Sequence, residues 1–408
     1  MIKELKEQLS ISPQTIQKIA EDFQEEMARG LVGKSSSLKM LPSYLNNPSG
    51  QEQGTFLALD FGGTNLRVLL VDLLGQGRFR LRDQLAFPLK DQERGYDYTS
   101  DKASAQELFD FIAVNIAEFI DLQKTYYLGH TFSFPFRLEG KNRGILINWT
   151  KEIKTKGVEG QEVTALLTQS LTRQGLNNVL PKAILNDTVG TQLTAAYQDP
   201  HCRIGSIIGT GHNSCYLEKD IIINMESGNF NLVPQNKYDK LLDADSEQPG
   251  SQLLEKLVSG KYIGEIVRLI VLDLQESGLF SSVNKELLAR KDGFSGAEMS
   301  LVLQGGIPKW QIDQQDLQVL REICSLVMQR SAALAAASYL GVFSHLGLQK
   351  TSRQTIAIDG SLFEKMPGYA QALQGFLDRA VGGKGSEIIL RLTKDGSGIG
   401  AAIAAAVN

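Results

Sequence analysis

The sequence predicts an α/β protein made of two domains. Its 408 residues exceed what one hydrophobic core usually serves, so two domains are the first expectation. Short apolar segments typical of strands alternate with longer segments whose apolar residues have helical spacing. One pattern, an apolar strand, a glycine-rich turn and a second apolar strand, occurs at 56–74 and again at 204–218. This repetition indicates a duplicated unit, and two such turns suit a nucleotide held between two domains.

Composition and charge narrow the class of protein. Hydrophobic residues make up 42% of the chain and charged residues 22%, as in soluble globular proteins. The net charge of −4 gives no basic excess that would indicate nucleic acid or an anionic membrane as a partner. The three cysteines have neither metal-ligand spacing nor a disulfide pattern, which suits a reducing compartment. With no signal-like N-terminus and no long uncharged apolar run, we expect a cytoplasmic protein without membrane or nucleic-acid partners.

The N-terminal region is predicted to be helical. Residues 2–30 carry apolar side chains at mostly helical spacing, and Ser12 and Pro13 suit the N-cap and first turn of a second helix. The Gly-Lys-Ser at 33–35 is similar to the end of a Walker A loop. That loop needs a further glycine where this chain has Ala28, and a strand where it has a helix. We therefore expect no nucleotide site at this position.

The turn of the first hairpin is a candidate phosphate site. Gly62 and Gly63 would let the main chain approach a ligand closely. Thr64 and Asn65 follow with side-chain donors beside backbone N–H groups, as a phosphate site needs. Asp60 ends the first strand, where its carboxylate could face a hydrated metal ion. An ordinary hairpin turn fits the same residues, and this stretch alone leaves both interpretations open.

The segment between the two hairpins offers three candidate positions at strand ends. Residues 104–122 begin with the Ser-x-x-Glu pattern of a capping box and are predicted to form a helix. Residues 127–136 are strand-like and place Ser133 near the strand end, where ligands meet the sheet in α/β folds. A later strand passes into a helix at Asn186 and Asp187. A helix cap is the common reason for such residues, and a general base directed into a cleft is the functional alternative.

Glycines mark the second hairpin turn and the last helix. The second turn, Gly-Thr-Gly at 209–211, repeats the candidate phosphate design, and a lone histidine such as His212 is more often a surface group than a ligand. Gly396 and Gly398 resemble a dinucleotide fingerprint between a strand and a helix. That fingerprint needs a later acidic residue, and none follows in this sequence. We expect these glycines to let a helix N-terminus approach a nucleotide or a neighbouring backbone.

Taken together, the segments resemble the eukaryotic-type hexokinase family. The matches lie in the family's order along most of the chain: LDFGGTNLRV, TFSFPF, NWTKEIKTKGVEGQEV, LNDTVGT, IIGTGHNSCYLE, NMESGNF, QPGSQLLEKLVSGKYIGEIVR, IDGS and DGSGIGAA. The resemblance implies the two-domain actin-like ATPase (ribonuclease H-like) fold, in which a small and a large α/β domain close over a cleft. It implies a small domain of 54–186 with the C-terminal helix 396–408, and a large domain of 1–53 and 187–395.

The resemblance also implies a hexose site. Carboxylates and amides bind adjacent hydroxyl groups well, and a hexose carries hydroxyls on every edge. Asp187 would be the general base toward the 6-hydroxyl, and the same site would serve glucose, fructose, mannose or glucosamine. The hexose-binding residues implied by the resemblance are Ser133, Thr150, Lys151, Asn186, Asp187, Asn213, Glu226, Gln252 and Glu255.

ATP with Mg²⁺ is the phosphoryl donor that the resemblance implies. Lys151 and Arg67 would offset negative charge that develops on the γ-phosphate. Asp60 would reach Mg²⁺ through water, because this ion keeps part of its hydration shell. The residues implied to contact the nucleotide are Gly62, Gly63, Thr64, Asn65, Gly209, Thr210, Gly211, Ser361, Gly396, Ser397 and Gly398.

The expected function is therefore an ATP:hexose 6-phosphotransferase of the first step of glycolysis, as a monomer or homodimer. One departure stands beside Glu226, where Ser227 replaces the tryptophan usual in the family and removes its apolar support. A bacterial-type sugar kinase would need a Cys-rich zinc motif, which the three cysteines of this chain do not supply. A non-catalytic hexokinase-like sugar sensor would have lost the base or a phosphate turn, whereas Asp187, Lys151 and both glycine-rich turns are present. An actin-like polymer-forming or chaperone ATPase would not need the hexose-binding residues, which this chain has.

Overall fold

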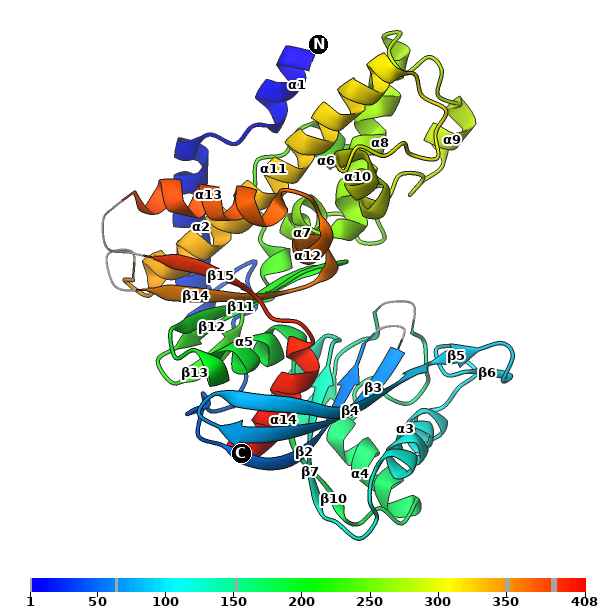
Figure 1. Cartoon of the computed structure of the whole chain (residues 1–408), viewed down its shortest axis with the longest axis vertical. Coiled ribbons are helices and arrows are strands. Elements are labelled where there is room, and N and C mark those ends of the chain that lie inside the picture. Colours follow the sequence, from blue (N-terminus) through cyan, green and yellow to red (C-terminus); the bar gives the residue numbers. More distant parts are fainter. Residues whose placement is uncertain (1, 63–64, 151–152, 349–352, 383–386) are drawn as a thin grey trace. The chain divides into compact units, whose positions relative to one another are not determined.

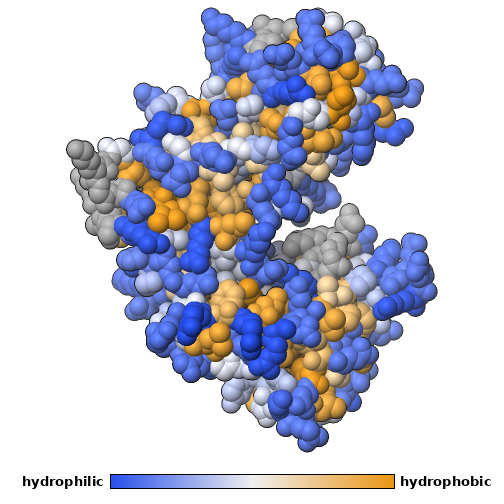
Figure 2. All heavy atoms as spheres, in the orientation of Figure 1, coloured by the Kyte–Doolittle hydropathy of each residue, from blue (hydrophilic) through white to orange (hydrophobic). Residues whose placement is uncertain are grey.

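The computed structural model describes residues 2–62, 65–150, 153–348, 353–382 and 387–408 (Figure 1). The chain forms two compact units, each with its own core. Unit 1 consists of Met1–Met40, Ser206–Ser214 and Met225–Leu392, and unit 2 of Leu41–Gly205, Cys215–Asn224 and Thr393–Asn408. Polar side chains cover much of the visible surface of both units, with apolar side chains in smaller patches (Figure 2).

Unit 2 contains a five-stranded sheet in the order β10-β7-β2-β3-β4. Its strands are β2 (Gln53–Phe61), β3 (Asn65–Gly75), β4 (Arg78–Pro88), β7 (Tyr126–Phe132) and β10 (Val179–Leu185). The first three form an antiparallel meander, and β7 lies between β2 and β10 and is parallel to both. The hairpin predicted at 56–74 is thus present. The unit also contains two short hairpins, β5 (Lys90–Asp91) with β6 (Tyr96–Asp97) and β8 (Phe136–Gly140) with β9 (Arg143–Leu146).

Helices cover both faces of this sheet. Successive side chains of a strand point to opposite faces, so the apolar residues of β2 are divided between two cores. Leu57, Leu59 and Phe61 of β2 join a core with α3 (Ala105–Phe119) and α4 (Val163–Arg173). The alternate residues of β2 join a second core with α5 (Asp187–Gln198) and α14 (Gly396–Val407). The capping box predicted for the helix after residue 104 is formed at the start of α3.

Helix α14 packs very closely on unit 2 at two glycines. A Cβ added to Gly129 of β7 would lie 1.8 Å from the carbonyl oxygen of Ala401. One added to Gly400 would lie 2.0 Å from the carbonyl oxygen of Gly190 on α5. Both contacts are with backbone atoms, so no side-chain rotation can relieve them. The glycines therefore fix the distance of α14 from both β7 and α5.

We predict that Gly129→Ala lowers the free energy of unfolding of unit 2 by about 2–3 kcal/mol, since α14 would have to shift. Gly140→Ala is the matched control, because a Cβ there meets nothing within 4 Å. Urea unfolding followed by the fluorescence of Trp149, in a Trp310→Phe background, reports on this unit. Equal midpoints for the two alanine variants would contradict the predicted close packing.

The second large sheet has six strands in the order β1-β13-β12-β11-β14-β15. These strands are β1 (Leu41–Pro42), β11 (Cys202–Ile208), β12 (His212–Glu218), β13 (Ile221–Asn224), β14 (Gln354–Asp359) and β15 (Ile388–Leu392). The division between the units falls within β11 and β12. The predicted second hairpin, at 204–218, corresponds to these two strands.

Unit 1 is built around α11 (Gln314–His345). This helix packs against α2 and α13, and its middle part is almost fully buried. By length and composition it is the one helix in the described ranges that could cross a membrane, but 89% of its most apolar window is buried inside the protein. The other helices of the unit are α1 (Ile2–Leu9), α2 (Pro13–Leu31), the 3₁₀ helix η1 (Ser227–Asn229), α6 (Lys237–Ala244), α7 (Leu253–Val258), α8 (Gly260–Glu276), α9 (Lys285–Ala289), α10 (Gly296–Leu303), α12 (Ser361–Lys365) and α13 (Tyr369–Val381).

The N-terminal predictions are confirmed in detail. Ser12 caps α2 and Pro13 is its first residue. Helix α2 ends two residues before Gly33, so a helix and not a strand precedes the Gly-Lys-Ser at 33–35. That segment therefore lacks the strand that a Walker A loop requires.

The compact units divide the chain at different residues from the domain ranges implied by the resemblance. Residues 187–205 were expected in the large domain, but α5 packs against α14 in unit 2. The close approach of Gly190 and Gly400 explains why these two helices belong together. The implied ranges, 54–186 with 396–408 and 1–53 with 187–395, stay a prediction.

Candidate functional site

The carboxyl ends of three parallel strands meet at one edge of the sheet in unit 2. Thr131 of β7 lies opposite Asp60 of β2 on one side and Leu185 of β10 on the other. Just beyond, the N–H group of Ser133 donates to the carbonyl of Phe61 at 3.2 Å. The strand register therefore gathers four predicted residues at this edge, where α/β folds bind ligands: Asp60, Ser133, Asn186 and Asp187.

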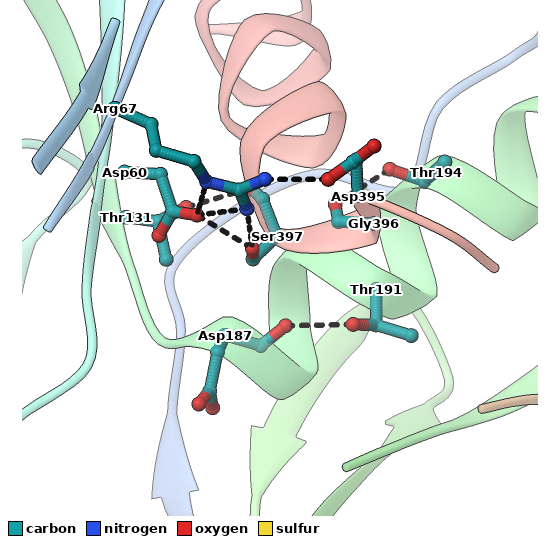
Figure 3. A network of polar contacts seen from close by, with 9 residues as sticks. All are labelled: Asp60, Arg67, Thr131, Asp187, Thr191, Thr194, Asp395, Gly396 and Ser397. Atoms are coloured by element: carbon teal, nitrogen blue, oxygen red, sulfur yellow. Dashed lines mark hydrogen bonds and ion pairs between the residues drawn. The ribbon is translucent and has the colours of Figure 1, made fainter. Parts of the chain in front are cut away.

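Asn186 and Asp187 have separate parts at the start of α5. Asn186 is the N-cap, and its Oδ1 accepts from the N–H of Thr188 at 3.1 Å. Asp187 is the first helical residue, is partly exposed, and its Oδ1 accepts from the same N–H at 2.8 Å. Its carbonyl accepts from the hydroxyl of Thr191 at 3.0 Å (Figure 3). Because Asn186 already caps the helix, the carboxylate of Asp187 is not explained by helix capping alone.

Arg67 is the centre of a second polar group at this edge (Figure 3). It lies opposite Asp60 across the β2–β3 pair, and its Nε donates to Oδ2 of Asp60 at 3.1 Å. Nη2 donates to the same oxygen, and Nη1 donates to Oδ1 of Asp395, the N-cap of α14. The hydroxyl of Ser397 also donates to Oδ2 of Asp60, at 3.0 Å. Strand β2, strand β3 and the start of α14 are thus joined through one guanidinium.

The charges of this group concern two predicted roles, that of Arg67 in offsetting phosphate charge and that of Asp60 in reaching Mg²⁺. Burial on its own would lower the pKa of Arg67, but the carboxylates of Asp60 and Asp395 outweigh burial and raise the pKa above its ordinary value. The positive charge is therefore permanent and balanced by two carboxylates. Asp60 is 6% exposed, and its contacts with Arg67 and Ser397 all go to Oδ2. Asp395 was not among the predicted residues, although it lies in the matching segment DGSGIGAA.

The glycines at the start of α14 are explained by packing. The hydroxyl of Thr194 donates to the carbonyl of Gly396 at 2.8 Å, and that of Thr131 donates to the carbonyl of Ser397 at 2.7 Å. A Cβ at Gly398 would lie 2.9 Å from the side chain of Leu69. Of the two partners expected for these glycines, a neighbouring backbone is present at Gly396, where an added Cβ would lie 3.0 Å from the Cα atom of Thr191. Their contact with a nucleotide stays a prediction.

Some predicted residues lie outside the described part of the chain. These are Lys151, Gly63 and Thr64, and the side chain of Asn65. Gly62 is the last residue of the described range 2–62, and Thr150 is the last residue of the described range 65–150. Thr150 is partly exposed, and its carbonyl accepts from the N–H of Ile153 at 3.3 Å.

In unit 1 the Gly209–Gly211 turn leaves two backbone N–H groups without a hydrogen-bond acceptor in the described ranges. The turn is closed by a hydrogen bond of 3.0 Å from the N–H of Gly209 to the carbonyl of Gly211. The first two N–H groups of α8, those of Gly260 and Lys261, donate to the carbonyls of Gly209 and Thr210 at 2.8 and 3.1 Å. Within the described ranges, the N–H groups of Thr210 and Gly211 have no hydrogen-bond acceptor. Such N–H groups can bind phosphate oxygens.

Ser361 lies beside this turn. It is the exposed first residue of α12 and follows Gly360, whose φ of 125° is open to glycine but strained for other residues. A Cβ added to Gly209 would lie 3.5 Å from the backbone nitrogen of Ser361. The two predicted nucleotide segments of unit 1 are therefore adjacent.

The predicted hexose residues of unit 1 also lie close together. Oδ1 of Asn213 accepts from the N–H of Ser227 at 3.1 Å, and its Nδ2 lies 3.5 Å from Oε1 of Glu226. Glu226 and Gln252 both have left-handed backbone conformations, with φ of 51° and 54°. Such strain in residues other than glycine is concentrated at functional sites. Oε2 of Glu255 accepts from a backbone N–H of β12 at 2.9 Å.

One expectation for this region needs correction, and one stays open. His212 was expected at the surface, but it is 2% exposed, and burial lowers its pKa to about 4. Alternation along β12 gave a signal for this, since His212, Ser214 and Tyr216 share one buried face. Ser227 was expected to remove the apolar support of Glu226, and that expectation stays a prediction. Its hydroxyl is buried and accepts from the hydroxyl of Ser214 at 2.8 Å, so a polar contact is present beside Glu226.

Comparison with known proteins identifies the family. Family models described as Hexokinase match residues 1–197 and 203–407. Hexokinase-7 of Oryza sativa subsp. japonica is 34% identical over 456 residues, which cover 100% of this chain and 96% of the rice protein. The chain belongs to the hexokinase family. Human Hexokinase-2 is 36% identical over 446 residues, which cover 98% of this chain and 47% of the human protein. The chain thus spans about half the length of that relative.

Solved structures of the family have the same fold. The chain aligns with a crystal structure of hexokinase with a TM-score of 0.88 and 32% identity, covering 100% of this chain and 98% of the other. It aligns with a hexokinase from Schistosoma mansoni complexed with glucose with a TM-score of 0.83, 32% identity and the same coverage. The predicted α/β, two-domain actin-like ATPase fold is therefore confirmed. The roles of the individual site residues stay predictions.

Proposed function

We propose that this hexokinase-family protein transfers the γ-phosphoryl group of ATP to the 6-hydroxyl of a hexose. The observation that carries the proposal is the place of Asp187 at the sheet edge. It is partly exposed, it is the first residue of α5, and the cap of that helix is supplied by Asn186. A carboxylate so placed can serve as a general base at a strand end. The glucose complex of the Schistosoma mansoni relative supports a hexose as the acceptor.

In the proposed reaction Asp187 orients the 6-hydroxyl and accepts its proton as the oxygen forms a bond to the γ-phosphorus. The bond from that phosphorus to the β,γ-bridging oxygen breaks, and ADP leaves with this oxygen. Phosphoryl transfer depends mainly on such positioning and on balancing charge. The N–H groups of Thr210 and Gly211 would bind phosphate oxygens, because the described part of unit 1 gives them no other acceptor. Lys151 would offset charge on the transferred group. Arg67 would do so only in part, since two carboxylates already balance it.

Mg²⁺ is part of this proposal, and the residues present fit it. The described ranges contain no cluster of three or more residues that could hold a metal ion, so a site made only of protein ligands is not expected here. Asp60 offers one buried carboxylate beside the hydroxyl of Ser397, which suits an ion that keeps water and binds phosphates. Mg²⁺ would neutralise phosphate charge, and Arg67 would hold Asp60 in place for it.

A panel assay tests the proposal. Glucose, fructose, mannose and glucosamine would each be supplied with ATP, GTP or polyphosphate, and 6-phosphate product measured by a coupled enzyme. We expect ATP to support phosphorylation of at least one hexose in the presence of Mg²⁺. Binding of a hexose by calorimetry without any product would instead support the non-catalytic sugar sensor.

A place in glycolysis, a cytoplasmic location and a monomeric or homodimeric state belong to the same proposal. The three cysteines are free and buried, which suits a reducing compartment. Fractionation of cells and light scattering of the purified protein would test the last two points.

A further inference from the structure

The buried side chain of His212 makes one hydrogen bond. Its Nδ1 lies 3.1 Å from the carbonyl oxygen of Ile207 in β11. Since a carbonyl can only accept, Nδ1 carries the proton and donates. Nε2 is then an acceptor, and it has no partner within the described ranges. Burial lowers the pKa of the ring to about 4, so the neutral form that makes this bond persists near neutral pH.

This bond spans the Gly209–Gly211 turn. Ile207 and His212 flank the turn on either side, so the ring joins the ends of β11 and β12 at its base. At the tip, the carbonyls of Gly209 and Thr210 are held by the first N–H groups of α8. The turn is therefore fixed from two directions. At its base, the ring of His212 bonds to the carbonyl of Ile207, and the hydroxyl of Ser206 donates to the carbonyl of Asn213 at 3.1 Å.

The main chain of His212 makes a separate contact. Its N–H group donates to Oε2 of Glu255, a predicted hexose residue, at 2.9 Å. A substitution at this position leaves that N–H in place and removes only the ring. The side chain and the main chain of one residue are thus directed to different parts of unit 1, which lets their effects be separated by experiment.

We propose that His212 is a positioning residue whose ring holds the Gly209–Gly211 turn in the shape that binds the phosphates of the nucleotide. The inference rests on the proposed function, because it assigns the turn to the phosphoryl donor. It is not a catalytic residue, since its ring is buried and bonded to the backbone. Its loss should act on nucleotide affinity and leave hexose affinity unchanged.

The test compares two substitutions. His212→Leu removes the donor, whereas the Nδ2 of His212→Asn stands close to the position of Nδ1 and can still donate to Ile207. His130→Leu is the matched control, because His130 is also buried and both its ring nitrogens lack partners in the described part of the chain. For each protein, KM would be measured for ATP and for hexose, and affinity for a non-hydrolysable ATP analogue would be measured by calorimetry.

We expect His212→Leu to raise KM for ATP about five- to tenfold, the scale of one lost hydrogen bond, with kcat and KM for hexose within about twofold. His212→Asn and His130→Leu should keep KM for ATP within about twofold of the wild type. The proposal is overturned if His212→Leu binds nucleotide normally, or if it weakens ATP and hexose alike. A raised KM for ATP in His212→Asn overturns it too, even if the leucine variant fails to fold.

The two proposals can fail separately. If the wild type phosphorylates no hexose, the proposed function fails, and calorimetry with the ATP analogue still tests His212. If hexose is phosphorylated and His212→Leu behaves as wild type, only the positioning role fails. Absence of nucleotide binding by the wild type would overturn both.

Discussion

Asp187→Ala is expected to lower kcat by about 10²–10⁴-fold, the range found when a positioned general base is lost. Affinity for hexose should stay within about tenfold, because the other hydroxyl-binding residues remain. The N-cap of α5 is Asn186, so the substitution should leave the helix and the sheet edge intact. Steady-state kinetics with hexose and ATP, together with calorimetry for hexose, would separate the loss of turnover from the loss of binding.

Asp199→Asn is the matched control for Asp187→Ala. Asp199 is the acidic residue at the other end of α5, and its Oδ1 accepts from the N–H of His201 at 3.0 Å. This variant should retain kcat within about twofold, since Asp199 lies at the end of α5 opposite to the sheet edge. Turnover near that of the wild type in Asp187→Ala would rule out Asp187 as the base. A fall in hexose affinity as large as the fall in kcat would instead assign it to binding.

Local patterns in the sequence predicted much of the architecture. Several correctly predicted features depend on residues only a few positions apart in the chain. They are the strand pairs at both glycine-rich turns, the cap at Ser12 and the capping box at residue 104. Such features are encoded by residues close in the chain, so a reading of the sequence finds them. Ser133 and Asp187 were placed at strand ends for the same reason, and the parallel register then brings those ends together.

Contacts between distant segments could not be predicted in the same way. Asp395 reaches Arg67 from a segment 328 positions further along the chain, and no local pattern connects the two. The glycines of α14 looked like a ligand-binding motif, because a glycine required by packing and one required by a ligand are identical in the sequence. Gly400 meets the backbone of Gly190, a contact that exists only once the unit is folded.

His212 shows how a residue type can mislead. Histidine in a turn is more often exposed, and this one follows a glycine-rich turn. In the structure His212 is the first residue of β12, where alternate residues face the core. The ring is accepted there because its N–H group finds the carbonyl of Ile207. A buried polar group with one good partner costs far less than one with none.

Arg330→Leu is expected to lower the free energy of unfolding of unit 1 by about 3–5 kcal/mol, because it leaves a carboxylate buried without its partner. Arg330 of α11 and Asp239 of α6 form a two-pronged ion pair, with N–O distances of 2.8 and 2.6 Å and side chains 4% and 1% exposed. Arg330 also donates to the carbonyl of Pro234 at 2.9 Å. Urea unfolding followed by Trp310, in a Trp149→Phe background, reports on this unit.

Two comparisons decide whether burial causes this effect. Lys18→Met removes a partner from the exposed ion pair with Asp22, where the lysine side chain is 69% exposed, and should leave the unfolding midpoint almost unchanged, because water screens the pair. The double variant Arg330→Leu with Asp239→Leu removes both buried charges and should recover much of the stability lost by Arg330→Leu, because no charge is then left unpaired. If the double variant is as unstable as the sum of its single variants, the pair acts through packing and not through its charges.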